Sequence, residues 1–111
     1  MEQHSRTQEE YVQRVLAAYR STPGTTGTIR RSDRVLAAQL YERGVPLMVI
    51  ENALVLAAAR RLIRRIDSPT LHTIRSLAYF VPVIEEVSSQ RLSADYFRYL
   101  RQKIERHAPA R

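Results

Sequence analysis

The sequence predicts an all-α fold, a compact bundle of about five helices with a helix-turn-helix-like pair in its middle. Apolar residues recur three and four positions apart in five separate segments. No segment alternates apolar and polar residues as a half-buried strand does. Hydrophobic residues make up 44% of the 111 positions, which is enough for one compact core. We therefore expect a single helical domain over residues 7–107, with flexible ends at 1–6 and 108–111.

The first helix is predicted over residues 7–20. Tyr11, Val15 and Tyr19 are spaced by four residues, which places them on one helical face. The next ten residues, 21–30, contain two glycines, one proline and four threonines, and are predicted as the only long loop. This loop lacks the Gly-Lys-Ser/Thr ending of a phosphate-binding P-loop, so that class of site is excluded.

Two helices, over residues 32–43 and 46–66, are predicted on either side of Gly44, a natural C-cap. The first begins with two good N-cap residue types, and the second begins with a proline. Helix, glycine turn and helix in this order are typical of DNA-binding proteins whose second helix reads base edges. The first four residues of the second helix are apolar, however, and the nearest polar candidates are Glu51 and Asn52. The alternative interpretation is two packed helices of a bundle joined by a Gly-Pro turn.

A fourth helix is predicted over residues 71–87, and it is apolar nearly all round, which is typical of a central helix. Pro82 interrupts this segment and should bend the helix or split it in two. The last helix, residues 94–107, is expected to be capped by Ser93. The side chains expected to face the core from this helix are Tyr96, Phe97, Leu100 and Ile104.

Positive charge is the most informative feature of the composition. The formal net charge is +7, and 17 of the 18 basic residues are arginine. A guanidinium group binds two phosphate oxygens at once, so this composition favours a nucleic-acid partner. A GC-rich genome also replaces lysine by arginine, but such a bias does not create the net charge itself.

The arginines expected to hold phosphate groups fall in three places: around the end of the 21–30 loop, at the end of the 46–66 helix, and on the outer face of the last helix. They are Arg30, Arg31, Arg34, Arg60, Arg61, Arg64, Arg65, Arg98 and Arg101. Threonine hydroxyls of the loop would add phosphate contacts. The alternative interpretation of the four arginines at the end of the 46–66 helix is a solvated helix end that pairs with Glu85, Glu86 or Asp67.

Aromatic side chains next to arginines could stack on single-stranded bases. The pair Tyr79-Phe80 follows a buried stripe, which favours core packing instead. The pair Tyr96-Phe97 does the same. Tyr99 falls off the buried stripe, between two arginines, and is the better candidate for stacking.

Catalytic chemistry has little support in the sequence. The chain has no cysteine, which excludes a disulfide framework, a thiolate zinc site and a cysteine nucleophile. His4, His72 and His107 form no pair with metal-ligand spacing. We therefore expect no enzyme activity, no metal and no cofactor. The longest apolar stretch, residues 53–59, is too short to cross a bilayer, and the polar N-terminus has no signal core, so we expect a cytoplasmic protein without membrane association.

Tyr79 and Val83 stand at the first two positions of a Tyr-x-x-x-Ile-x-x-x-Trp pattern, and Val87 occupies the position of the tryptophan. On these positions and on the segment 40–53, residues 33–87 resemble the DnaD-type domain of bacterial and phage replication proteins. The resemblance implies a compact helical bundle that binds DNA during replication or helicase loading, often encoded on mobile elements.

Taken together, the sequence predicts a nucleic-acid-binding helical module. The expected partner is DNA, duplex or single-stranded, held through phosphate contacts in the replication, recombination or transcription of a bacterial or mobile-element genome. A replication protein, an integrase or a transposase is a further expected partner, and homo-oligomers are compatible with the sequence. The alternative is a protein-interaction adaptor, or a homodimerising bundle, that does not touch nucleic acid.

Overall fold

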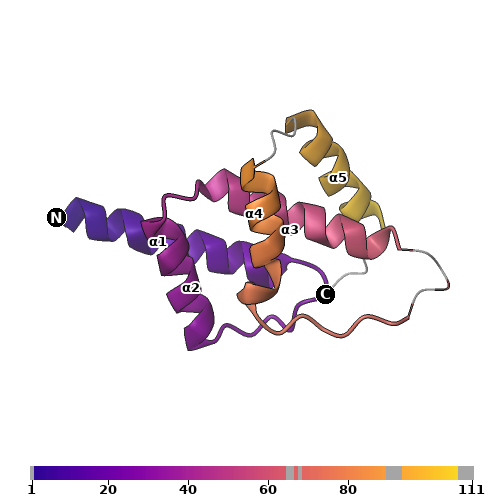
Figure 1. Ribbon diagram of the computed structural model, residues 1–111, viewed down its shortest axis with the longest axis horizontal. Coiled ribbons are helices and arrows are strands. Elements are labelled where there is room, and N and C mark those ends of the chain that lie inside the picture. The colour runs from indigo at the N-terminus through magenta and orange to yellow at the C-terminus, as the bar shows by residue number, and fades with distance from the viewer. Residues whose placement is uncertain (1, 65–66, 68, 90–93, 108–111) are drawn as a thin grey trace.

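Five α-helices and one short 3-10 helix make up the regular structure of the computed structural model, which describes residues 2–64, 67, 69–89 and 94–107. In chain order the elements are α1 (Glu2–Ser21), α2 (Arg31–Glu42), α3 (Leu47–Leu62), η1 (Leu77–Phe80), α4 (Val81–Ser89) and α5 (Ala94–His107) (Figure 1). Within these residues no strand forms, and the β-type contact is an isolated parallel bridge between Thr25 and Ile74. The predicted all-α bundle of about five helices is confirmed.

Helix α3 is the central element of the bundle. It packs against α1, α4 and α5, and Figure 1 shows α4 crossing it and α5 descending obliquely toward its right-hand part. Four of its buried residues are alanines, whose small side chains let the neighbouring helices approach closely. The sequence predicted the 71–87 segment as the central helix, and this is wrong. Helix α4 has only nine residues, and it buries Ile84 and Val87 on one side.

Residues 71–76 are extended rather than helical, which corrects the prediction of a helix from residue 71. The Thr26 amide donates to the Ile74 carbonyl at 3.0 Å, and the Ile74 amide donates to the Gly24 carbonyl at 2.7 Å. These bonds pair the extended segment with the 22–30 loop, and Figure 1 shows the two running side by side below the helices. Backbone groups that would have bonded within a helix are satisfied by this pairing instead.

Several helix ends differ from their predicted positions. Helix α1 begins at Glu2 rather than near residue 7, and α5 spans the predicted residues. Helix α3 ends at Leu62, four residues before its predicted end, and the Ile63 amide donates the closing hydrogen bond to the Ala59 carbonyl. Pro82 was expected to bend or split the predicted 71–87 helix. It is the second residue of the short helix α4, where a missing N–H costs nothing. Ser93, expected to cap α5, lies outside the described residues.

The core is filled by large side chains from every part of the chain. Tyr19 of α1 meets Phe80 of η1 edge to face, with ring centroids 6.1 Å apart. Leu40, Ile50 and Ile84 are also fully buried, so α2, α3 and α4 contribute to the same core. Phe97 and Leu100 bring α5 onto it, as predicted.

Asp33 is a buried carboxylate that joins two distant parts of the fold. It is the third residue of α2 rather than its N-cap, and it is 1% exposed. One carboxylate oxygen accepts from the Arg30 amide at 2.9 Å, and the other accepts from the Leu77 amide at 2.9 Å. The first bond closes the start of α2, and the second attaches η1 to it. The fully buried Tyr19 hydroxyl lies nearby, and its pKa is raised by burial and by the charge of Asp33.

Asp33→Asn is expected to lower the free energy of unfolding by about 2 kcal/mol, measured by urea denaturation. An amide carries only one acceptor oxygen, so its NH2 group would face one of the two backbone N–H donors. Glu42→Gln makes the same chemical change at an exposed position of the same helix and should leave stability nearly unchanged. Equal stabilities of the two variants would contradict this role of Asp33.

Candidate nucleic-acid interface

Arg61, in the last turn of α3, connects three separate segments. Its guanidinium donates to the His72 carbonyl at 3.1 Å and to the Tyr79 hydroxyl at 3.3 Å. It also lies against Gly24 of the 22–30 loop, where a Cβ atom would come within 3.1 Å of Nε. Gly24 has φ +93°, a left-handed conformation that glycine adopts without strain. The arginine predicted to hold phosphate therefore also holds the extended segments against α3.

Arg60 forms an ion pair with Glu86 at the protein surface. This is the alternative interpretation of the arginine cluster, in which a helix end pairs with nearby carboxylates. The Arg60 guanidinium makes two hydrogen bonds to the Glu86 carboxylate, one of them at 2.8 Å. The bonds from Arg60 lower the pKa of Glu86 and raise that of Arg60. Arg43 makes a similar pair with Glu85 at 2.8 Å. Both pairs attach α4 to the elements before it, and they neutralise two of the arginine charges.

The charges of Arg61 and Arg64 are not balanced by a carboxylate, because the oxygen atoms that they contact among the described residues are neutral. Arg64 donates to the Pro69 carbonyl, and Arg61 donates to a carbonyl and a phenol oxygen. A hydrogen bond to a neutral oxygen orients a guanidinium without compensating its charge, and several of its donors remain. Arg65, the fourth member of the predicted cluster, lies outside the described residues.

Two adjoining hollows open beside these arginines. The first, of about 300 Å³, we call the Arg64 hollow; its lining includes Arg60, Arg61, Arg64, Leu71, Tyr79 and Val83. The second, of about 620 Å³, we call the Arg75 hollow; its lining includes Arg61, Leu71, His72, Thr73, Arg75 and Tyr79. The described residues that line the two hollows include four arginines; Arg60 is neutralised by Glu86, and the other three meet no carboxylate there. This part of the surface is therefore strongly basic.

Two of the predicted arginines, Arg30 and Arg31 at the start of α2, lie next to this surface. Asp33 binds the Arg30 and Leu77 amides together, so the start of α2 adjoins the segment that carries Arg75. Arg30, Arg31 and Arg75 are exposed there, whereas Arg34, which is also exposed, lines a separate hollow with Gln8 and Glu9 of α1. The list of expected phosphate-binding residues did not include Arg75. Arg75 lies in the segment 69–76, which pairs with the loop 22–30. The two segments are distant in sequence, and no local pattern showed that they would pair.

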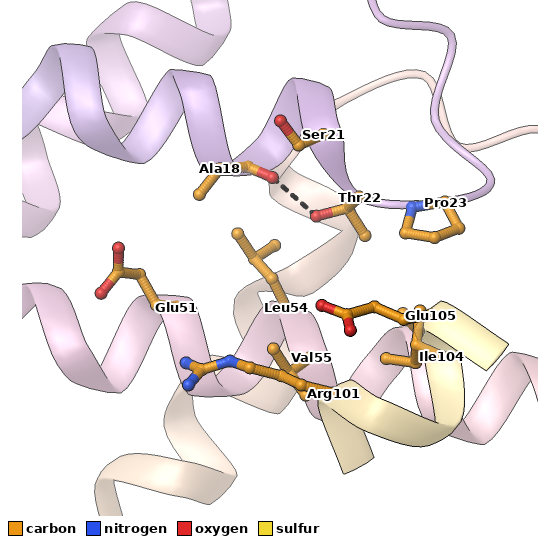
Figure 2. A pocket seen from close by; sticks show the side chains of 11 residues that line it. Ala18, Ser21, Thr22, Pro23, Glu51, Leu54, Val55, Arg101, Ile104 and Glu105 are labelled. Atoms are coloured by element: carbon orange, nitrogen blue, oxygen red, sulfur yellow. Dashed lines mark hydrogen bonds between the residues drawn. The ribbon is translucent and has the colours of Figure 1, made fainter. Parts of the chain in front are cut away.

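The predicted arginines of α5 lie on a different surface. Arg101 donates to the side-chain oxygen of Asn52 at 3.3 Å and lines a groove of about 510 Å³ between α1, α3 and α5. Figure 2 shows Arg101 and Glu105 on the α5 side of this groove, Glu51 on α3, and the apolar floor between them. Arg98 is exposed on the same helix. The predicted arginines that the structure describes therefore do not form one continuous site.

Glu51 and Asn52, the nearest polar candidates for reading bases, are engaged inside the bundle. Glu51 pairs with Arg14 of α1 at 3.7 Å, and Asn52 accepts from Arg101 of α5. Both side chains are half-buried. Helix α3 is thus enclosed by its neighbours, whereas a recognition helix must present one face to the major groove. This arrangement favours the interpretation of α2 and α3 as two helices of a bundle.

The aromatic pairs divide between core and surface. Phe80 and Phe97 are buried, as core packing predicts, while their neighbours Tyr79 and Tyr96 are 48% and 42% exposed. Tyr99, the preferred stacking candidate, is 55% exposed and has the Lys103 ammonium 5.9 Å from its ring centre. Of these tyrosines, Tyr79 is the one that lines the two basic hollows.

The described residues form neither a metal centre nor a membrane-spanning helix. In the described part of the chain, no group of three or more histidine, aspartate or glutamate side chains gathers as metal ligands would. No helix there combines the length and the apolar character needed to cross a bilayer. Comparisons of the chain with protein-family models, with curated proteins and with solved structures found no match.

Arg61→Ala is expected to increase hydrogen exchange at the Thr26 and Ile74 amides about tenfold, because the arginine holds the two paired segments against α3. Arg75→Ala is the matched control, since it removes the same side chain beside Ile74 without removing an observed contact to α3. Mass-spectrometric exchange of peptides covering both segments measures the effect. Equal exchange in both variants would show that Arg61 does not hold the segments.

Proposed function

We propose that the protein binds nucleic acid through the basic surface formed by the Arg64 hollow, the Arg75 hollow and the adjoining start of α2. The observation that carries this proposal is the gathering of Arg61, Arg64 and Arg75 around the two hollows, none of them paired with a carboxylate in the described part of the chain. The net charge of +7 adds a general attraction for a polyanion. DNA is the proposed ligand.

Phosphate contacts supply most of the binding in this proposal. Arg61 and Arg64 are oriented by neutral oxygens and keep their charge for phosphate groups. Arg75 lines the second hollow together with Arg61, and Arg31 is exposed at the adjoining start of α2. Hydroxyl groups of the extended segments, such as those of Thr28 and Thr73, add neutral donors. Such contacts position a nucleic acid without reading its sequence.

A role in the replication, recombination or transcription of a bacterial or mobile-element genome stays a prediction, as does the resemblance to DnaD-type domains. In such a role the protein would work beside a replication protein, an integrase or a transposase. Binding that is strong but indifferent to sequence suits a module that another protein brings to its site of action.

The groove between α1, α3 and α5 supports a second candidate, an adaptor that binds another protein. Leu54, Val55 and Ile104 form an apolar floor, and Glu51 and Glu105 add negative charge at the sides. A volume of about 510 Å³ has room for a few apolar side chains of a partner. This groove shares no residue with the basic hollows, so variants can separate the two functions.

The double variant Arg31→Ala/Arg75→Ala is expected to weaken binding to a labelled oligonucleotide. The slope of log K against log salt should become shallower by about 2, one for each lost phosphate contact. Fluorescence anisotropy at a series of salt concentrations measures both quantities.

The matched control is Arg14→Ala/Arg106→Ala, which removes the same charge from α1 and α5 and should change the slope little. Absence of binding by the unmodified protein at about 50 mM salt, where phosphate contacts are strong, would refute the proposed function. An equal loss in the control would instead show that total charge, rather than this surface, attracts the ligand.

A further inference from the structure

Tyr79 stands between the two basic hollows. Together with Arg61 and Leu71 it lines both of them, so these three side chains form the wall that separates the Arg64 hollow from the Arg75 hollow. Each hollow lies near or within the size range of small-ligand sites. A ligand that fills both must pass over the tyrosine.

The orientation of the Tyr79 ring is fixed from its inner side. It meets the fully buried Phe80 ring edge to face, with centroids 5.1 Å apart and planes at 78°. Its hydroxyl accepts from Arg61, whose guanidinium carbon lies 5.9 Å from the ring centre. About half of the side chain nevertheless remains open to solvent. The ring is therefore both held in place and accessible.

A fixed aromatic ring beside cations matches the requirements of an unpaired nucleotide strand. Single strands are bound by base stacking on aromatic rings and by basic groups that follow the backbone. In a duplex the bases are stacked on each other and present only their edges in the grooves, so a tyrosine in a hollow cannot reach their faces. Duplex binding would make no use of the Tyr79 ring.

The two sides of the wall differ in a way that suits successive parts of such a strand. The Arg64 hollow has Leu71 and Val83 as apolar surface for a base, with Arg64 at its side. The Arg75 hollow has Arg75 and the hydroxyl of Thr73, which suit a phosphate and a sugar.

Tyr99 provides a comparison within the same chain. It is more exposed than Tyr79 and also has a cation near its ring, that of Lys103. It does not line either of the two hollows. If exposure beside a cation were sufficient, Tyr99 would be the better stacking residue; the hollows favour Tyr79.

We propose that the basic surface takes an unpaired nucleic-acid strand, with a base stacked on Tyr79 and the neighbouring phosphates on the Arg64 and Arg75 sides. This inference rests on the proposed function and specifies its ligand.

The test compares a single-stranded oligonucleotide with a duplex of the same length by fluorescence anisotropy. The unmodified protein should bind the single strand more tightly. Tyr79→Leu should weaken single-strand binding roughly tenfold and leave duplex binding within about twofold, because it removes one stacking ring and no charge. Tyr79→Phe keeps the ring and should retain most of the affinity. Tyr99→Leu, the matched control, should bind like the unmodified protein.

A second measurement needs no variant and so does not depend on the folding of Tyr79→Leu. The chain has no tryptophan, so a fluorescent base analogue in the strand can be excited without interference from indole. Stacking on Tyr79 should change the analogue's emission on binding, and a strand of abasic sites should bind as weakly as the duplex.

The outcomes separate this inference from the proposed function. Equal or tighter binding of the duplex, or an abasic strand that binds as well as a normal one, would overturn the inference and leave the proposed function in place. Equal losses for Tyr79→Leu on strand and duplex would also overturn it, because they indicate a structural role of the ring. Binding to neither ligand would refute both.

Discussion

The carboxylate of Asp33 has almost no access to water, and the arrangement of the fold depends on how it is satisfied. An ionised group in such a place is tolerated only when hydrogen bonds replace its hydration. The Arg30 and Leu77 amides provide them, each at 2.9 Å. The start of α2, the 3-10 helix and the extended segments on both sides are thereby fixed to one point. The basic surface is assembled from those segments and the end of α3.

Local patterns were sufficient to predict most of the helices. The four-residue spacing of Tyr11, Val15 and Tyr19 identifies α1, and the boundaries of α5 were predicted as they are. The segment 71–76 could not be predicted in this way. Its apolar residues have helical spacing, but Ile74 pairs with a loop nearly fifty residues earlier in the chain. The extended conformation of this segment depends on the loop with which it pairs. Hydrophobic periodicity contains no information about such pairing.

The candidate site shows the same limit. The sequence identified the arginines at the end of α3 as basic residues on one helix end, but not which of them would be neutralised. Arg60 meets Glu86, whereas Arg61 meets only uncharged oxygens, and this difference arises from where α4 and η1 come to lie. Arg75 and Tyr79 were not expected to act with these arginines because they join the surface only through long-range pairing.

The Asp33–Leu77 hydrogen bond has a consequence for the order of folding. It joins residues 44 positions apart, so its formation requires the closure of a long loop. The bond from Arg30 to the same carboxylate spans three residues and forms with α2 itself. Helices α1 and α2 are neighbours in the chain and can associate early, while the extended pair must wait for η1. A chain still emerging from the ribosome therefore carries many of its arginines before it has the surface on which they are gathered.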